Sequence, residues 1–364
     1  MLGREILSSI KAYEPGKPTS EVQRELGLER VIKLASNENP LGPSKLAVEA
    51  MISALSGCHY YPDPNSYYLK EALAGRLGVK PSEIVLGAGA DEVIYFVCQA
   101  FLNNGDEVVL AKLTFPIFTI AAQVMGGQVI TSEMRNFTYD LKALLAAITP
   151  KTKLIFIANP NNPTGTVVTQ REVDEFLEEV PDGVVTILDE AYYEYVVNPS
   201  FPDSLSYVRA GKNIIVLRTF SKIYGLAGIR VGYGLAKEQI TQLMNKVRPV
   251  FTPNILGQVA ALAALEDKEH FRKSLELNEA GKKYLYKEFT RLGLNYCLTE
   301  TNFIFVDCGV NSRFLFQELL KQGVIIRPVT TVYGNSYARI TIGSQEDNEI
   351  LVDALELTLN GLRT

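Results

Sequence analysis

The alternation of apolar, strand-like runs with helical segments between residues 82 and 236 is the feature that most constrains the fold. These runs are apolar along their whole length, which is typical of strands covered on both faces. Strands that alternate with helices predict an α/β fold, with a parallel or mostly parallel sheet and helices on both faces. The predicted strands are residues 83–86, 107–110, 153–157, 184–188 and 213–217, and the predicted helices are 91–102, 117–125 and 170–179.

The pattern changes after residue 236. Helices are predicted over 237–248 and 254–266, followed by a longer, charged amphipathic helix over 269–292 that would connect two domains. A compact α+β unit follows, with strands at 301–306, 324–326 and 338–342 and helices at 312–322 and 347–359. We therefore expect an N-terminal arm over residues 1–35, a large domain over 36–252 and a smaller C-terminal domain over 253–364.

Composition and charge exclude several classes of partner. The net charge is −5 at pH 7, so the chain lacks the basic excess that binding to nucleic acid requires. No stretch approaches the roughly 18 uninterrupted apolar residues of a membrane span, and the first residues lack the apolar core of a signal peptide. We therefore expect a cytoplasmic protein with neither a nucleic-acid nor a membrane partner.

Histidine usage limits the chemistry. His59 and His270 are the only two histidines and lie far apart in the sequence, which excludes a multi-histidine metal site. We expect no metal. If the chain performs acid–base chemistry, then Lys, Tyr, Asp or Glu side chains are expected to carry it.

Four strand ends carry unusual residues, and ligands of open α/β sheets bind at the carboxyl ends of strands. The first, residues 86–92, is a glycine-rich turn that leads into a helix, where free N–H groups suit a phosphate. Glu92 stands where a dinucleotide-binding fingerprint needs its third glycine. Taken alone, this turn is equally consistent with a purely structural role.

The second and third strand ends carry polar groups directly after predicted buried strands. Residues 158–165 are dense in Asn and Pro, which fix a tight loop and allow one asparagine amide to point into a cleft. Asp189 ends an apolar strand, where a carboxylate is usually a helix cap or is paired with another group. A cationic partner is the functional interpretation of Asp189.

The fourth strand end carries Lys222, among glycines and aromatic residues. A lysine held in an apolar cleft has a lowered pKa, and its free amine can form a Schiff base. Thr219, Ser221 and Arg230 around it are a second set of phosphate ligands. Together the four ends supply a phosphate site, an amide, a buried carboxylate and an imine-forming lysine, which is the set that pyridoxal phosphate needs.

These residues belong to a longer pattern that covers nearly the whole chain. The sequence resembles fold-type I pyridoxal-phosphate aminotransferases of the class I/II group, and more closely the histidinol-phosphate aminotransferase branch. Asn-Pro-Thr-Gly at 162–165, Asp-Glu-Ala-Tyr at 189–192 and Ser-Lys at 221–222, in this order, are specific for the superfamily. Tyr-Glu-Pro-Gly-Lys at 13–17 and Asn-Glu-Asn-Pro at 37–40 narrow the resemblance to that branch.

The resemblance implies pyridoxal 5′-phosphate as cofactor and a role for each matching residue. Lys222 would bind the cofactor covalently and then move a proton between the substrate Cα and the cofactor C4′. Asp189 would pair with the protonated ring nitrogen, and Asn162 and Tyr192 would hydrogen-bond the ring oxygen. Further implied contacts are the ring of Phe115, where relatives often have Tyr, and, at the phosphate, the N–H groups of Ala90 and Asp91, the side chains of Thr219, Ser221 and Arg230, and Tyr61 of a neighbouring subunit.

The resemblance also implies a substrate and an assembly. Arg339 would bind the carboxylate of glutamate or the phosphate of histidinol phosphate by a bidentate fork, assisted by Tyr13, Asn37 and Arg327. The implied reaction is transamination of L-histidinol phosphate with 2-oxoglutarate, giving imidazole-acetol phosphate and glutamate, in histidine biosynthesis. The implied assembly is a homodimer with shared active sites.

Several alternatives stay open or are disfavoured. An aromatic amino-acid aminotransferase or a threonine-phosphate decarboxylase would use the same scaffold, because one arginine can serve a carboxylate or a phosphate. A nucleotide-binding dehydrogenase is disfavoured by Glu92 and by the combination of Lys222 with Asp189. A transcription regulator built on this scaffold needs a DNA-binding domain, which we do not expect before Tyr13, where the enzyme-like pattern begins.

Overall fold

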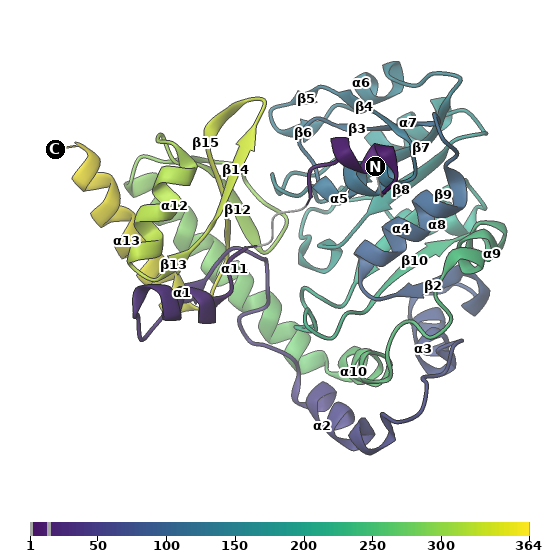
Figure 1. Cartoon of the computed structure of the whole chain (residues 1–364), viewed down its shortest axis with the longest axis horizontal. Coiled ribbons are helices and arrows are strands. Elements are labelled where there is room, and N and C mark those ends of the chain that lie inside the picture. The colour runs from purple at the N-terminus through teal and green to yellow at the C-terminus, as the bar shows by residue number, and fades with distance from the viewer. Residues whose placement is uncertain (1–2, 13–15, 364) are drawn as a thin grey trace.

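Two sheets, each with its own hydrophobic core, organise the protein (Figure 1). The computed structural model describes residues 3–12 and 16–363 of the 364-residue chain, the last two through their backbone only. The long helix α11 (Lys268–Arg291) begins next to α10 (Ile255–Glu266) and runs up to the smaller sheet in this view.

The larger sheet is mixed and, within the described residues, has seven strands. Six of them run parallel, and β10 is antiparallel to both of its neighbours. This arrangement confirms the predicted α/β class with a mostly parallel sheet. In spatial order the strands are β2 (Ile84–Gly87), β10 (Gly232–Ala236), β9 (Ile214–Thr219), β8 (Val185–Asp189), β7 (Thr152–Ala158), β3 (Glu107–Ala111) and β4 (Gln128–Ser132).

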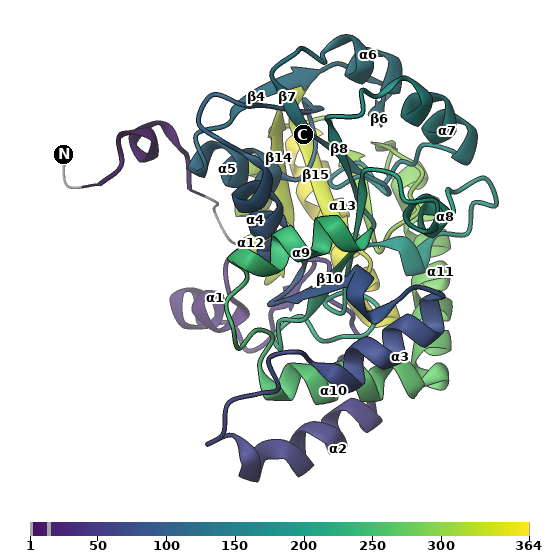
Figure 2. The same cartoon turned by 90° about the vertical axis from the view of Figure 1, so that its right-hand side faces the viewer.

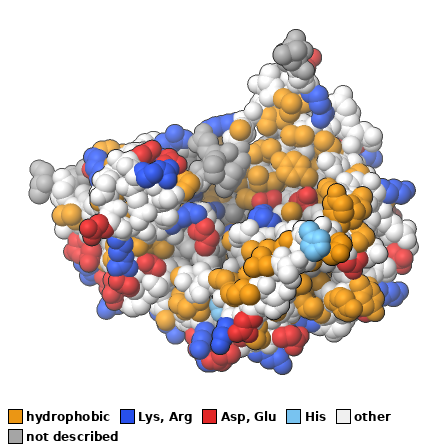
Figure 3. Space-filling view, turned by 60° about the horizontal axis from the view of Figure 1, so that its bottom comes forward, with side chains coloured by type: hydrophobic (Ala, Val, Ile, Leu, Met, Phe, Trp, Pro, Cys, Tyr) orange, Lys and Arg blue, Asp and Glu red, His pale blue; other side chains and the backbone are white. Residues whose placement is uncertain are grey.

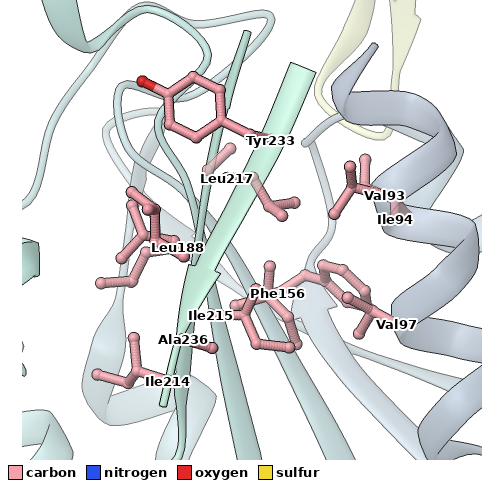
Figure 4. Packing of buried hydrophobic residues seen from close by; sticks show 14 of the residues in the cluster. Val93, Ile94, Val97, Phe156, Leu188, Ile214, Ile215, Leu217, Tyr233 and Ala236 are labelled. Carbon is pink, nitrogen blue, oxygen red and sulfur yellow. The ribbon is translucent and has the colours of Figure 1, made fainter. Parts of the chain in front are cut away.

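Packing on both faces explains why these runs are apolar throughout. Val93 and Val97 of α4 (Ala90–Phe101) contact the sheet from one side, while Leu188 and Ile214 point to the other side (Figure 4). The central strands β8 and β9 are buried along their whole length. The adjacent strands β7, β8 and β9 therefore end at one buried edge, where Ala158 pairs with Asp189 and Asp189 with Leu217.

The smaller sheet is antiparallel and, in the part of the chain that the structure describes, has four strands. Helices α12 and α13 and part of α11 bury its outer face in a second core, which includes Leu285, Leu315 and Leu355. Its strands are, in spatial order, β11 (Asn295–Tyr296), β12 (Phe303–Asp307), β15 (Gly334–Thr341) and β14 (Arg327–Thr331).

The remaining elements connect and cover these sheets. The strands outside the two main sheets are β1 (Ile32–Lys33), β5 (Met134–Arg135), β6 (Thr138–Tyr139) and β13 (Val324–Ile325). The other α-helices are α1 (Thr19–Leu26), α2 (Lys45–Ala54), α3 (Tyr67–Leu77), α5 (Pro116–Val124), α6 (Leu141–Ala146), α7 (Gln170–Glu179), α8 (Ser204–Arg209), α9 (Glu238–Val247), α12 (Ser312–Lys321) and α13 (Gln345–Arg363). Short 3-10 helices are η1 (Glu5–Ser9), η2 (Leu55–Gly57), η3 (Pro81–Glu83) and η4 (Tyr193–Tyr195).

The N-terminal segment divides into two parts. Residues 3–12, which include η1, project away from the body of the molecule (Figure 2). Residues 19–35, by contrast, pack against the C-terminal part of the chain, because the fully buried Val22 of α1 meets Leu320 and Ile325. Strand β1 also pairs in parallel with β13.

The sequence pattern predicted α7 to the residue and the other predicted helices and strands to within a few residues, but it missed several elements, among them α2, α3 and β14 and, in the large sheet, β4 and β10. The glycines of β10 hide the strand pattern, and one of them serves a close contact. A Cβ at Gly232 would collide with the backbone of Gly89 and Ala90, so glycine lets the start of α4 lie against β10. No helix in the described residues has the length and apolar character needed to cross a membrane.

Candidate active site

Lys222 lies in the turn after β9, at the buried edge of the large sheet. Its Nζ donates a hydrogen bond to the carbonyl oxygen of Ser36 at 3.2 Å and lies 5.6 Å from the centre of the Tyr192 ring. Desolvation by the surrounding protein, with a further contribution from the charge of Arg339, lowers the pKa of Lys222 to about 8. An appreciable fraction of the amine is therefore unprotonated near neutral pH, as a nucleophile requires.

Asp189 is the last residue of β8 and is 6% exposed. One carboxylate oxygen accepts a hydrogen bond from the N–H of Ala191 at 3.0 Å, and the carboxylate forms no ion pair among the described residues. Burial raises the pKa of Asp189 to about 7. Because a nearby cation would favour the ionised carboxylate, this site suits a positively charged partner.

The start of α4 forms one side of the site. Its first turn begins at Ala90, after Gly89 in a positive-φ conformation (φ 90°). A side chain at Gly89 would collide with the guanidinium of Arg230, so glycine allows the arginine to lie against the start of the helix. Unsatisfied N–H groups at a helix start together with a guanidinium are a typical phosphate site.

Arg230 connects this helix start to the Ser221–Lys222 turn. Its Nη1 donates to Ser221 Oγ at 3.3 Å and to the Ala227 carbonyl at 3.0 Å. Its Nη2 lies 3.7 Å from the carboxylate of Asp91. Thr219 belongs to the same group, because its Oγ1 accepts from the Ser221 N–H at 3.1 Å. The structure thus brings together the residues predicted from two separate strand ends to hold a phosphate.

Arg339 of β15 reaches from the small sheet to the loop after β7. Its Nη1 donates to Asn162 Oδ1 at 2.8 Å, and its Nη2 donates to the Ala35 carbonyl. The Asn162 oxygen is thereby used, which leaves the amide N–H groups of Asn162 to donate to a ligand oxygen. Arg339 is only 9% exposed, so these contacts hold a buried guanidinium beside Asn162.

Asn37 joins the two sheets beside the Tyr192 hydroxyl. Its Nδ2 donates to Tyr192 Oη at 2.8 Å, and its Oδ1 accepts from Thr341 Oγ1 at 3.1 Å. Asn37 is 1% exposed and has a φ of 58°, a conformation that asparagine adopts more readily than most residues. The loop around Asn37 therefore fixes where the Tyr192 hydroxyl lies.

The remaining predicted residues are placed less centrally. Phe115 caps α5 next to the Asn161 loop, since the neighbouring Thr114 hydroxyl donates to Asn161 Oδ1 at 2.9 Å. Arg327 is half-buried on β14 and is the cross-strand partner of Arg339. Tyr61 is 78% exposed and its ring stacks on Phe251, away from the contacts of Lys222 and Arg230. Tyr13 lies outside the described residues.

Some contacts of the site were missed from the sequence. The carbonyl groups of Ala35 and Ser36, which hold Arg339 and Lys222, carry no side-chain signal that could have indicated them. Behind Asp189, the buried Glu190 and Arg218 form an ion pair at 2.8 Å, with the Arg218 guanidinium over the Tyr193 ring. Glu190 therefore has a structural partner of its own, and Arg218 forms its ion pair with Glu190 instead of with Asp189.

The chemistry of these groups fits pyridoxal phosphate, which carries an anion, an electrophilic carbonyl and a ring nitrogen that can hold a proton. The start of α4 with Arg230 matches the anion, and the amine of Lys222 matches the carbonyl. The unpaired carboxylate of Asp189 matches a protonated ring nitrogen. This donor set has no comparable use for a nicotinamide or a metal ion.

Comparisons with known proteins agree with this fit. The family model described as aminotransferase class I and II matches residues 29–355. A histidinol-phosphate aminotransferase of Moorella thermoacetica is 54% identical over 353 residues, covering 97% of this chain and 92% of that protein. One of Caldicellulosiruptor saccharolyticus is 44% identical, covering 98% of this chain and 99% of that protein.

Solved structures give the same result. The histidinol-phosphate aminotransferase of Sinorhizobium meliloti, solved in complex with pyridoxal-5′-phosphate, matches with a TM-score of 0.92 and 29% identity, covering 99% of this chain and 98% of that one. An aspartate aminotransferase double mutant of Thermus thermophilus matches with a TM-score of 0.85 over 99% of this chain and all of that one. At 24% identity, this second match concerns the fold alone.

Proposed function

Because the chain belongs to the class I and II aminotransferases, we propose that it is a pyridoxal-phosphate enzyme that transfers the amino group of L-histidinol phosphate to 2-oxoglutarate. The products are imidazole-acetol phosphate and glutamate, and the reaction belongs to histidine biosynthesis. The observation that carries the proposal is the position of a lysine amine of lowered pKa, Lys222, and a buried carboxyl, Asp189, at the ends of the adjacent strands β9 and β8.

The proposed cofactor contacts follow from the positions of the side chains. Lys222 holds the cofactor carbonyl carbon through its amine, and Asp189 holds the proton on the ring nitrogen. Tyr192 and the N–H groups of Asn162 donate to the ring oxygen, while the Phe115 ring covers one face. At the phosphate, the N–H groups of Ala90 and Asp91, the hydroxyls of Thr219 and Ser221 and the guanidinium of Arg230 donate hydrogen bonds.

In the reaction, the bound cofactor supplies a carbonyl that takes up an amino group and a ring that withdraws electrons from the substrate Cα. Once the substrate has taken the place of Lys222 on the cofactor, the free amine of Lys222 would act as the base that removes the proton from the substrate Cα. The pKa of about 8 suits this role, because the amine both accepts and returns a proton near neutral pH.

We assign substrate binding to two arginines of the small sheet and to two residues of the N-terminal part of the sequence. Arg339 binds the carboxylate of glutamate or the phosphate of histidinol phosphate, with Asn37, Arg327 and Tyr13 as further contacts. Both substrates carry an anionic group beside the reacting carbon, because a single methylene separates the phosphate of histidinol phosphate from the carbon that bears the amine, and the α-carboxylate of glutamate is attached to that carbon. One guanidinium can therefore serve both halves of the reaction in turn.

The experiment that tests this function is an absorbance titration of the cofactor-loaded protein. Histidinol phosphate should change the visible absorbance of the bound cofactor at low concentration, and phenylalanine should do so only in large excess. A preference for phenylalanine would assign the protein to aromatic amino acids. Release of carbon dioxide from threonine phosphate would instead make it a decarboxylase. No visible band after addition of pyridoxal phosphate would contradict the roles of Lys222 and Asp189.

A second arm of this titration addresses Arg339. Arg339→Gln should weaken the response to histidinol phosphate and to glutamate by similar factors of about 10–10², since a charged hydrogen bond contributes about 1.5–3 kcal/mol. The cofactor band itself should stay, because Arg339 holds the substrate in this proposal. Unchanged responses to both substrates would remove Arg339 from the substrate site.

We also propose that two copies of the chain form a dimer in which Tyr61 reaches the cofactor phosphate of its partner. Large apolar side chains gather on the face that carries α2, the loop over residues 58–66 and the start of α3 (Figure 3). The most exposed of them there are Ile52, Leu55, Tyr60, Tyr61, Tyr67, Tyr68 and Val250, at 54–78%. A patch of this kind on a folded protein marks an interaction surface.

Mixed dimers give a direct test of the shared site. The Lys222→Ala and Tyr61→Ala chains should each have low activity alone. Co-expressed, they should regain activity, because one site of the mixed dimer combines an intact lysine with the intact tyrosine of the other chain. The absence of any recovery in a dimer confirmed by sedimentation would place Tyr61 outside the partner's site.

A further inference from the structure

Phe137 lies at the tip of the β5–β6 hairpin and contacts the small sheet. Its ring lies against three aromatic rings, with centroid distances of 5.3 Å to Phe305 of β12, 5.4 Å to Tyr337 of β15 and 5.5 Å to Tyr333 in the turn between β14 and β15. The rings of Phe305 and Tyr337 are themselves stacked at 5.0 Å. We call these four residues the aromatic cluster.

The backbone at this tip has positive φ angles, which are unfavourable for a phenylalanine. Arg135 pairs with Thr138, so Asn136 and Phe137 form a two-residue loop, with φ of 50° and 61°. Such loops strongly favour glycine at the second position, and a bulky residue there is a genuine outlier. Backbone strain of this kind persists when surrounding contacts over-determine it, and here the aromatic cluster supplies those contacts.

The aromatic cluster shares its sheet face with Arg339. Phe305 is the direct cross-strand partner of Arg339, and Tyr337 lies two residues before it on the same strand. Side chains at these positions point to the same face of a sheet. The face of the small sheet that meets Phe137 is therefore the one that carries the proposed substrate guanidinium.

The hairpin is also tied to the loop on the other side of that guanidinium. Thr166 Oγ1 donates to the Phe137 carbonyl at 2.8 Å and lies 2.8 Å from Thr164 Oγ1. Asn161 Nδ2 donates to Thr164 Oγ1 at 2.9 Å. The next residue, Asn162, accepts the hydrogen bond of Arg339. Phe137 thus contacts the sheet that carries Arg339 through its ring and the loop that carries Asn162 through its carbonyl oxygen.

We propose that Phe137 is a positioning residue that holds the small sheet against the Asn161–Thr166 loop and thereby keeps Arg339 in place for the anionic end of both substrates. The inference rests on the proposed function, because it assigns Arg339 to the substrate. Phe137 acts on Arg339 through Phe305 and Tyr337 and itself touches neither cofactor nor substrate.

The main test compares Phe137→Ala with the cofactor-loaded parent enzyme. The KM for histidinol phosphate and the KM for 2-oxoglutarate should both rise about tenfold, which corresponds to about 1.4 kcal/mol, while kcat and the cofactor band change little. Phe137→Tyr, which keeps the ring, should restore both KM values. Phe314→Ala, at a 44% exposed phenylalanine on α12, is the matched control and should leave both unchanged.

A second variant separates this role from a purely structural one. Phe137→Gly suits the positive φ of the turn, so the hairpin should form without the strain of the parent loop. A purely structural role predicts parental KM values for a well-folded Phe137→Gly enzyme. The proposal predicts the same rise in both KM values as for Phe137→Ala, and parental values would overturn it.

The contact itself can be observed because the chain contains no tryptophan. Tyr333→Trp places the only tryptophan of the chain in the aromatic cluster, and its emission, excited selectively at about 295 nm, should shift to the red when Phe137→Ala is added. Identical emission with and without Phe137 would show that the contact does not form in solution and would overturn the proposal. A parent enzyme with no transaminase activity would instead overturn the proposed function, whereas a parental KM in an active Phe137→Ala enzyme overturns this inference alone.

Discussion

Replacing Lys222 with alanine should lower turnover by at least about 10⁴-fold, the upper end of what one positioned acid–base group contributes. The expected loss is this large because the same amine has two tasks, the covalent hold on the cofactor and the removal of the proton from the substrate Cα. The surroundings are built for the amine, since desolvation lowers its pKa to about 8 and the Ser36 carbonyl fixes its direction. Single-turnover absorbance measurements with histidinol phosphate would report the effect.

Two further variants make the Lys222 result specific. Lys222→Arg keeps a positive charge but removes the nucleophilic amine, so it should be as inactive as Lys222→Ala. Lys287→Ala, at a lysine whose side chain is 81% exposed on α11, should retain parental activity. After borohydride reduction, the cofactor should be found covalently on the peptide that contains residue 222. Labelling of another lysine would contradict the assignment.

The sequence predicted those parts of the site that depend only on residues next to one another in the chain. Asp189 and Lys222 each follow a strand whose apolar run is long enough to be recognised, so the edge of the sheet could be placed from the pattern alone. The glycine turn before α4 was visible in the same way, although it was ambiguous by itself. Its partner, the Arg230 guanidinium, lies against Gly89 only because the fold brings residues 89 and 230 together.

The parts that could not be predicted depend on long-range contacts or on backbone groups. The Arg339–Asn162 hydrogen bond joins two residues 177 positions apart, and Asn37 reaches Tyr192 across 155 positions. The carbonyl acceptors at Ala35 and Ser36 have no side-chain signature. Strand β10 was missed because Gly232 serves a close backbone contact instead of packing a side chain. The strain at Phe137 is likewise a property of the folded turn, since nothing in its side chain indicates a positive φ.

Asp189→Asn should have opposite effects on activity and on the stability of the cofactor-free protein. With cofactor bound, removal of one partner of a buried ion pair costs about 3–5 kcal/mol, which corresponds to a loss of about 10²–10⁴-fold in turnover. Asparagine keeps the shape of the side chain but cannot hold a proton on the ring nitrogen. Steady-state rates of the loaded enzyme would measure this loss, with Asp182→Asn at an exposed loop position as the control.

Without cofactor, the carboxylate of Asp189 is buried and forms no ion pair with a residue that the structure describes. Its pKa is about 7 in the folded chain and about 3.9 in an unfolded one, so the folded state binds the proton more tightly. The contribution of Asp189 to stability is therefore fully present below about pH 4 and is lost as the pH rises to about 7. Asp189→Asn removes this dependence. The melting temperature of the cofactor-free variant should accordingly be close to that of the parent at pH 4. It should exceed the parental melting temperature by a growing margin as the pH rises to about 7.

Thermal melts of both cofactor-free proteins across this pH range would decide whether Asp189 is held for its charge. One outcome is that the variant is more stable than the parent near pH 7 without cofactor but less active with cofactor bound. This outcome would show that the Asp189 carboxylate lowers the stability of the folded chain and serves the cofactor. A variant that is less stable than the parent at every pH would show that asparagine disrupts the local turn. In that turn, one oxygen of Asp189 accepts a hydrogen bond from the N–H of Ala191. In that case the loss of activity would follow from a local distortion, and the pairing of Asp189 with the ring nitrogen would have to be withdrawn.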